Sequence, residues 1–572
     1  MFIITILLAK NLLLETHGII LTMTYSELKS RLATIKELAD KEKTLTSLET
    51  LFLNFSECVL EMNATQRAEI QTLKNEINKL KGEQGQPKVR KQTKPSDHSS
   101  EDDRKKGNKQ KRRGKTGSKK SKAKADRTVR LEMPNEALPA DAVRDGVKKT
   151  LIQDIAITTN NTLFVRQQYY SPSENKYYLT PLPAGYDGEY GPNIKTWSSV
   201  LYSAHEMTMT NIASLFHTAG VWVSKSTILG FITQSGNTMA DEKVSIAKAG
   251  VQSTPYQHLD DTAGRERGKS CHVNVLGNAL FSAYFTLSGK DRLSIIEMLS
   301  FAGTKLLINN TAFEVMTMMN IDTPIITALK AHASSTFLST SRFNDIIDTI
   351  LAGKKQKQVR KLLLEAVTIA AYRQSPYAIK QLIADDAPQF KLITEALGLC
   401  WVHEGRHYKK LNPIFKKHKQ ATERFVEQFW SYYHELVAYK KLPTPELAIA
   451  LRKKFQTLFA TQTGYDKLDK QITATSKKIG SLLLVLEHPS IPLHNNPAEH
   501  MARRQARARD IHMHTMSEEG TNVKDTLATL VGTAKKLSVN IFDYLHDRIT
   551  QTFSMTALAE LITIQAEQLN SS

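Results

Sequence analysis

With 572 residues the chain exceeds the usual size of a single domain, so several domains are expected. Its 41% hydrophobic and 23% charged residues exclude a fibrous or wholly disordered protein. The net charge of +20 favours a polyanionic partner, nucleic acid before a membrane surface. Three cysteines, Cys58, Cys271 and Cys400, cannot form a disulfide framework, and a reducing cytoplasm fits them best.

The first 23 residues contain two short apolar runs, 2–9 and 12–14, which Lys10 and Asn11 separate. A membrane span needs about 20 apolar residues, and a secretory signal needs a basic start, so we expect neither. Two interpretations stay open: translation begins at Met23, or the segment is a frayed amphipathic helix.

The region 1–85 is predicted to be helical. Apolar residues at spacings of 3, 4 and 3 near its end are typical of a short coiled-coil seam: Ile70, Leu73, Ile77 and Leu80. Two heptads give only a short zipper. The seam therefore predicts either a local helical hairpin or a modest dimer contact.

Residues 86–128 are predicted to be a disordered basic linker. Between Arg104 and Arg127 there are 13 lysines or arginines and one acid, Asp126, without aromatic or large aliphatic side chains. Such a segment cannot bury enough apolar surface to fold. Its single sign of charge favours an arm that contacts DNA phosphates without sequence specificity, centred on Lys111, Arg112 and Arg113.

Residues 129–200 have a strand-like pattern and are predicted to form a small β module. The runs Ile155–Thr158 and Leu163–Arg166 predict one hairpin, and the tyrosine-rich runs on either side of residues 172–175 predict a second. No cysteine lies between Cys58 and Cys271, so no zinc is expected here.

The region 201–245 predicts a helix-turn-helix: a helix at 210–218, a turn at Gly220, and a Ser-capped helix at 224–233. An ordinary helical hairpin would show the same pattern. In a chain this basic, DNA binding is the competing interpretation. The N-terminal end of the recognition helix would then be Lys225, Ser226 and Thr227.

The region 246–515 contains two acidic doublets, Asp260-Asp261 and Asp385-Asp386, each after a short apolar run. The first doublet is expected to end a strand, and strands at 272–276 and 279–287 are expected to follow as a hairpin. Helical insertions are predicted at about 291–375 and 412–488. Residues 516–572 are predicted to be a C-terminal helical region.

A third acid, Glu499, begins a helix. Asn496 is a good N-cap and Pro497 suits the first helical position, so a capping box is one explanation of Glu499. A cap does not explain why Arg503 and Arg507 follow at one-turn spacing on the same face. The competing explanation is a metal ligand beside a phosphate-binding ridge.

Three segments together resemble the DDE transposases of the insertion-sequence 66 type. They are His258-Leu259-Asp260-Asp261-Thr262, then Ile383–Phe390 with Cys400–Arg406 behind it, and then His494-Asn495-Asn496-Pro497-Ala498-Glu499. The resemblance spans about residues 130–550. It implies a ribonuclease H-like catalytic core with a mixed sheet inside a multidomain α/β chain. Such transposases often carry a cysteine zinc module, and its absence here puts a zinc-finger role in doubt.

The resemblance implies that Asp260, Asp385 and Glu499 are catalytic and hold two Mg²⁺ ions, with Mn²⁺ as a substitute. One ion would activate water or a DNA 3′-hydroxyl, and the other would stabilise the leaving oxygen. Asp261 and Asp386 are the alternative ligands at each doublet. Zinc is not expected at Cys400 and His403, because a lone C-x-x-H pair is a weak signal.

The predicted function is that of a transposase that binds the terminal inverted repeats of its element and target DNA, and catalyses cleavage and strand transfer. It is expected to act as a homo-oligomer in the bacterial cytoplasm, without membrane association. Further DNA contacts are expected from side chains near the acids: His403, Arg406, Asn495, Asn496, Arg503 and Arg507. The alternatives are a structure-specific nuclease or resolvase of the same fold, and a transposase-derived DNA-binding protein without catalysis.

Overall fold

The computed structural model describes residues 47–80, 125–131, 147–186, 188–301, 303–351 and 356–570. The first 23 residues and Lys111, Arg112 and Arg113 of the basic arm lie outside the described residues. The chain divides into two compact units, each assembled from separate stretches of sequence. Unit 1 comprises Met1–Lys94, Pro255–Leu259 and Thr304–Asn495, and unit 2 comprises Pro95–Thr254, Asp260–Gly303 and Asn496–Ser572. The units therefore differ from the contiguous domains predicted from the sequence, since 246–515 contributes to both.

A five-stranded mixed sheet has the strand order β5-β4-β3-β6-β7. Its strands are β3 (Tyr256–Glu266), β4 (Lys269–Gly277), β5 (Ser282–Leu287), β6 (Gln381–Ala384) and β7 (Ala396–Leu399). Strands β4 and β5 pair antiparallel, whereas β6 pairs parallel with both β3 and β7. Most other described elements are helices, so the prediction of a multidomain α/β protein is confirmed.

Strand β3 continues well beyond Asp260, so the prediction that this acid ends its strand was wrong. The residues after Asp260 are mostly polar, which hid the strand from a search for apolar runs. A two-residue turn of Arg267 and Gly268, with φ of 48° and 76°, joins β3 to β4. Positive φ at both positions is what a tight hairpin turn requires.

The predicted hairpin of β4 and β5 is present, with a longer connection than expected. Asn278 organises this connection, because its Oδ1 accepts the amides of Leu280 at 2.8 Å and Phe281 at 3.3 Å. Its Nδ2 donates to Ser253 Oγ at 2.8 Å. The second strand therefore starts at Ser282 rather than at 279.

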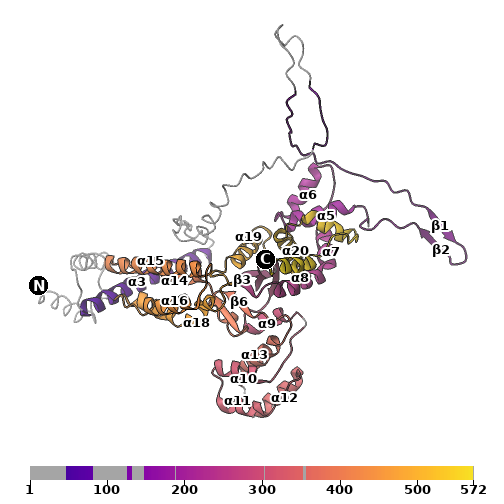
Figure 1. Cartoon of the computed structure of the whole chain (residues 1–572). Helices are drawn as coiled ribbons and strands as arrows, with labels where there is room; N and C mark the ends of the chain where they lie inside the picture. The colour runs from indigo at the N-terminus through magenta and orange to yellow at the C-terminus, as the bar shows by residue number, and fades with distance from the viewer. Residues whose placement is uncertain are drawn as a thin grey trace, which may run out of the picture. The chain divides into compact units, whose positions relative to one another are not determined.

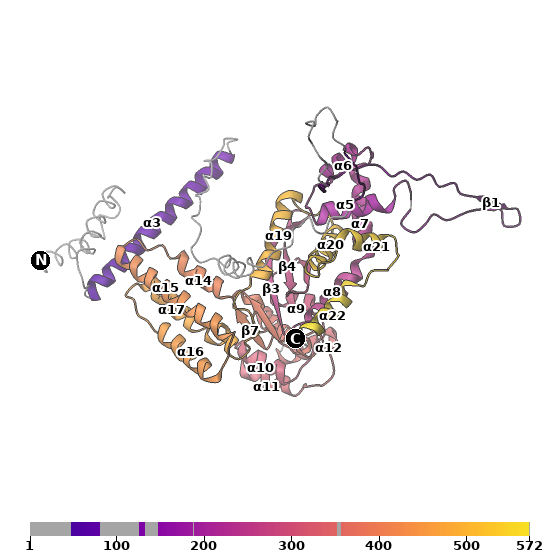
Figure 2. The same ribbon diagram turned by 45° about the horizontal axis from the view of Figure 1, so that its top comes forward.

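Unit 2 places its helices around β4 and β5 (Figures 1 and 2). The helices are α5 (Pro192–Ser203), α6 (Met209–Thr218), α7 (Lys225–Thr238), α8 (Ala240–Gln252), α9 (Arg292–Ser300), α19 (Asn496–His512), α20 (Glu518–Lys536), α21 (Ile541–Ile549) and α22 (Leu558–Asn570). The predicted C-terminal helical region is thus an integral part of this unit.

Helix α20 covers the outer edge of β5, where no further strand of the described residues pairs. Three of its buried polar side chains, one turn apart, accept the outward-facing amides of the strand. The contacts are Thr286 N to Asp525 at 2.6 Å, Tyr284 N to Thr529 at 3.1 Å and Ser282 N to Thr533 at 3.2 Å. An open sheet edge invites pairing with other chains. The polar side chains of α20 thus accept the hydrogen bonds that a sixth strand would otherwise accept from β5.

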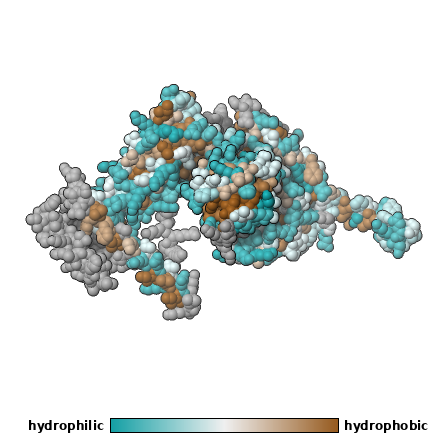
Figure 3. All heavy atoms as spheres, turned by 90° about the horizontal axis from the view of Figure 1, so that it is seen from below, coloured by the Kyte–Doolittle hydropathy of each residue, from teal (hydrophilic) through white to brown (hydrophobic). Residues whose placement is uncertain are grey.

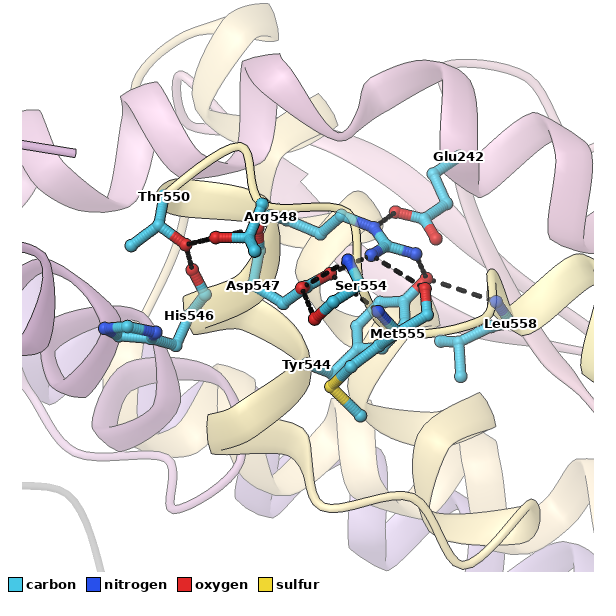
Figure 4. A network of polar contacts seen from close by, with 10 residues as sticks. Glu242, Tyr544, His546, Asp547, Arg548, Thr550, Ser554, Met555 and Leu558 are labelled. Atoms are coloured by element: carbon cyan, nitrogen blue, oxygen red, sulfur yellow. Dashed lines mark hydrogen bonds and ion pairs between the residues drawn. The ribbon is translucent and has the colours of Figure 1, made fainter. Parts of the chain in front are cut away.

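A buried arginine ties α21 to α8 and to the segment before α22 (Figure 4). Arg548 bonds Asp547 and Tyr544, and its Nε lies 3.5 Å from Glu242 on α8. Asp547 in turn accepts from Ser554 N and Oγ at 2.8 and 2.7 Å. Burial raises the pKa of Glu242 despite the opposing effect of Arg548. A buried charge needs such partners to be tolerated.

Only the second of the two predicted hairpins is formed, by β1 (Gln168–Ser171) and β2 (Lys176–Leu179). Its tyrosines pair across the strands, with the rings of Tyr170 and Tyr177 4.8 Å apart. Such pairs stabilise a two-stranded ribbon. The first hairpin, at 155–166, lacks such aromatic pairs and forms no strands. Its apolar side chains are exposed, among them Ile155, Leu163 and Val165. Brown, apolar residues also lie on the surface of the arm at the right of Figure 3, which carries β1 and β2.

Unit 1 consists largely of helices. They are α3 (Ser47–Leu80), α10 (Asn310–Met318), α11 (Thr323–Lys330), α12 (Thr340–Ile350), α13 (Lys357–Arg373), α14 (Trp401–Lys410), α15 (Lys416–Tyr439), α16 (Pro445–Leu458), α17 (Asp466–Ser476) and α18 (Ile479–Leu482). Both predicted insertions are accordingly helical. Among the described helices, none has the length and apolarity to cross a membrane.

Trp401, at the start of α14, lies in the centre of an aromatic core in unit 1. Its ring contacts those of Phe429 on α15 and Phe455 on α16, and its indole N–H donates to Leu482 O at 2.9 Å. A buried indole needs such a partner for its polar atom. This packing fixes the position of the N-terminal end of α14, which begins two residues after β7 ends.

Candidate metal site and DNA-contacting residues

Hydrogen bonds in unit 1 join the three sequence motifs at positions next to their acids. Asn495 Nδ2 donates to the carbonyl of Leu259, the residue before Asp260, at 2.9 Å. Cys400 N donates to the carbonyl of Ala384, the residue before Asp385, at 3.1 Å. Asn495 N donates to Cys400 Sγ at 3.2 Å. These three hydrogen bonds hold the motifs together.

Asn495 is a structural residue, so the prediction that it contacts DNA was wrong. It is fully buried, and its Oδ1 lies 2.9 Å from His258 Nδ1. With the bond to Leu259, both ends of its amide are used inside the protein. A buried amide that is satisfied in this way fixes the surrounding backbone. It thereby sets where the chain enters α19.

Asp385 directly follows β6, as predicted. Its carboxylate accepts the amide of Ala387 at 3.2 Å, which forms a tight turn after the strand. In the parallel pairing of β3 and β6, His258 is the partner of Ile383. Asp260 and Asp385 each come two residues after these partners.

Asp260 lies on the face of the β3–β4 hairpin that α19 covers. Val275 of β4 packs against Ala498 and Met501 of α19, and Figure 2 shows the helix alongside β4. A Cβ on Gly264 of β3 would lie 3.3 Å from Val273, which packs on the same cluster. Because side chains alternate along a strand, Asp260 shares this face and Asp261 faces the other side.

The second acid of each doublet is held by lysine. Lys290 Nζ lies 2.9 Å from Asp261. Asp386 has two such partners, Lys391 at 2.7 Å and Lys478 at 2.9 Å. Burial alone would raise the pKa of Asp386, but the two lysines outweigh it and lower this pKa. Both second acids, Asp261 and Asp386, therefore form ion pairs within the protein.

Glu499 lies in the first turn of α19 and is only 7% exposed. Arg503, one turn later and itself exposed, donates to Glu499 Oε2 at 3.1 Å. The predicted capping box does not form, because Asn496 Oδ1 is buried and makes no hydrogen bond within the described part of the chain. A capping box needs two reciprocal hydrogen bonds, and the one that Asn496 would accept is missing, so the structure does not support a capping box at Glu499.

The basic face of α19 divides into exposed and internal arginines. Arg503 and Arg507 are exposed, as a phosphate-binding ridge would need. Arg504 instead donates to Ser203 O and lies 3.6 Å from Glu206, and Arg509 donates to Ala263 O. Arg503 and Arg507, which were predicted to share one face of the helix, are thus both exposed, and their contact with DNA stays a prediction.

His403 and Arg406 lie on one face of α14, half-buried, with Arg406 Nη1 3.0 Å from His403 Nε2. Between them, Glu404 points into the unit and binds Lys478 at 2.9 Å. Lys478 thus bridges Glu404 and Asp386. No local pattern predicted the role of Lys478, which lies 92 residues after Asp386 in a helical insertion.

Two helices, α6 and α7, occupy the region predicted as a helix-turn-helix, and α7 ends five residues later than predicted. Ser224 caps α7 by accepting Thr227 N at 3.1 Å, and its hydroxyl also contacts those of Ser226 and Thr227 at 2.7 and 2.8 Å. Lys225 is exposed, and so is Trp222 in the turn. Of the three predicted contacts, Lys225 is the one whose functional group the cap does not use.

One curated protein is similar to much of the chain: the uncharacterized protein y4jO of Sinorhizobium fredii (strain NBRC 101917 / NGR234). The two are 32% identical over 324 residues, which cover 56% of this chain and 99% of y4jO. Neither a family model nor a solved structure matches the chain. Because nearly all of y4jO is covered, the chain belongs to the same protein family as y4jO.

Proposed function

We propose that the protein is a DNA transposase that binds the ends of its mobile element and catalyses metal-dependent cleavage and strand transfer. The observation that carries the proposal is the set of hydrogen bonds joining Leu259, Ala384, Cys400 and Asn495. Each motif supplies one acid a few residues from this network. A ribonuclease H-like core requires such convergence, and the mixed sheet with a β3–β4–β5 meander followed by parallel β6 and β7 supports it.

Asp260, Asp385 and Glu499 would hold the metal. All three offer carboxylate oxygens, the ligands that Mg²⁺ prefers. Lysines pair with Asp261 and Asp386, and the resemblance favours the first acid of each doublet as the ligand. Two Mg²⁺ ions, when bound, would activate a water or 3′-hydroxyl and neutralise charge on the leaving oxygen.

The remaining residues would position DNA. Arg503 and Arg507 would contact phosphates beside Glu499 through charge-assisted hydrogen bonds. Arg503 would exchange its bond to Glu499 for one to the substrate. The exposed start of α7, with Lys225, would enter a groove of the end sequence. The basic arm would add affinity without specificity.

The test is cleavage and joining of DNA that carries the element's own ends, in Mg²⁺ and in chelator. We expect Asp260→Asn to abolish both reactions while DNA binding persists. The matched control is Asp261→Asn at the neighbouring position, which should retain most activity. Cleavage without joining by the wild type would instead indicate a nuclease or resolvase. Activity retained by Asp260→Asn would refute the assignment.

A further inference from the structure

The connection between α5 and α6 contains a glutamate in a backbone conformation that suits glycine. Helix α5 ends at Ser203 and α6 begins at Met209, and between them Glu206 has a φ of 57°. The left-handed region is unfavourable for a residue with a Cβ, and glycine or asparagine usually occupies it after a helix. An unfavourable backbone at such a residue points to a contact that its side chain makes.

Arg504 of α19 supplies that contact. Its Nε lies 3.6 Å from Glu206, and its Nη2 donates to the carbonyl of Ser203. Each side chain of this ion pair is only 20% exposed, so water and salt screen the attraction only in part. Burial raises the pKa of Tyr284 on β5, and Arg504 is close enough to oppose this rise. Arg504 therefore connects α19 to the α5–α6 connection at the sheet.

A second contact between α19 and this region lies about two turns further along the helix. His512 Nε2 donates to the carbonyl of Met207 at 3.1 Å. The His512 ring also stacks on that of Tyr202, with centroids 4.5 Å apart and 7° between the planes. Ala508, which lies midway between the two contacts, is buried. Because Arg504, Ala508 and His512 follow at one-turn spacing, a single face of α19 meets the end of α5 and the connection.

The neighbouring face of α19 carries the proposed metal ligand. Glu499, Arg503 and Arg507 follow at one-turn spacing, and Arg503 donates to Glu499 at 3.1 Å. Successive residues of a helix are turned by about 100°, so the face of Arg503 adjoins the face of Arg504. Helix α19 thus uses one face to contact the α5–α6 connection and the next face to present Glu499.

We propose that the ion pair of Glu206 and Arg504 is a positioning link between α19 and the helices α6 and α7. The inference rests on the proposed function, in which α7 binds the end of the element. The connection that contains Glu206 leads directly into α6, and α7 follows α6. End DNA bound at α7 is thereby held in a fixed position relative to Glu499. Glu206 and Arg504 act through Glu499 and touch neither DNA nor metal.

The variant that tests the link is Glu206→Gly, because glycine suits this backbone and removes the ion pair. The full chain should melt no lower than the wild type and bind end DNA within about twofold of the wild-type affinity. Joining at saturating DNA in Mg²⁺ should nevertheless slow about tenfold, because Glu499 is less well positioned. The matched control is Gln551→Gly, the same change at an exposed residue with φ of 54°, and it should join at the wild-type rate.

A double-mutant cycle completes the experiment. Arg504→Met should reproduce the defect of Glu206→Gly, and Arg504→Lys, which keeps the charge and a donor, should retain more joining activity. Glu206→Gly combined with Arg504→Met should be no slower than Arg504→Met alone, since the two residues act as one unit. Additive losses, or wild-type joining by Glu206→Gly, would overturn the link and leave the proposed function standing. A wild type that does not join end DNA would overturn both.

Discussion

The cover of the sheet edge by α20 gives a prediction whose magnitude follows from the structure. Thr529 is fully buried, and its hydroxyl accepts Tyr284 N at 3.1 Å. Thr529→Val keeps the size of the side chain but leaves this buried amide without an acceptor. A buried donor without a partner costs about 1–3 kcal/mol. Thr526, on the same helix and equally buried, donates only to the helix carbonyl of Asn522. Thr526→Val should therefore cost less than about 1 kcal/mol.

Hydrogen exchange followed by mass spectrometry measures this difference locally, which suits a chain of two units. If the substitution lowers the free energy of opening of the β5 edge by about 1–3 kcal/mol, peptides covering β5 should exchange about 5- to 150-fold faster in Thr529→Val than in the wild type. The same peptides should change little in Thr526→Val. Equal exchange in the two variants would show that α20 does not stabilise the edge through these bonds.

Three further predictions concern other residues. Asn495→Leu should destabilise the protein by about 2–4 kcal/mol, because it removes the side-chain hydrogen bonds to His258 and Leu259. Thermal melting measures this loss, and an unchanged melting temperature would argue against a structural role. Lys225→Ala should lower the preference for end DNA over random DNA by about 1 kcal/mol or more in competition binding, and unaltered preference would place recognition elsewhere. Burial lowers the pKa of Lys536 to about 7, below its value in the unfolded chain. The unfolded state then binds more protons, so stability should rise between pH 7 and 10 by at most about 1.4 kcal/mol per unit. Lys536→Met should remove that rise in urea unfolding, and an identical pH profile would contradict it.

Local patterns in the sequence predicted the elements that local physics determines. The two helices α6 and α7 were predicted from their apolar spacing and Ser224, and β6 from the run before Asp385. Helix α19 was found from Pro497 and the residues around it. These signals lie within a few residues of the structure they specify.

Features that depend on distant partners were missed. The role of Asn495 depends on Leu259, 236 residues away in sequence. The continuation of β3 depends on pairing with β4, since its residues after Asp260 are polar. The cover of β5 did leave a signal: Asp525, Thr529 and Thr533 recur at one-turn spacing along α20, among apolar residues such as Leu527 and Leu530. Polar residues on an apolar face indicate a buried hydrogen-bonding role.

The most direct test of the proposed metal site is strand transfer by Glu499→Gln, because the cap and the ligand interpretations predict opposite results. Glutamine keeps the shape and can still close a helix cap, so a capping role predicts near-normal activity. A ligand role predicts that joining collapses in Mg²⁺ while melting temperature and DNA affinity stay near wild type. Asp510→Asn, at an exposed acid on the same helix, is the control and should be fully active. Near-normal strand transfer by Glu499→Gln would contradict the assignment.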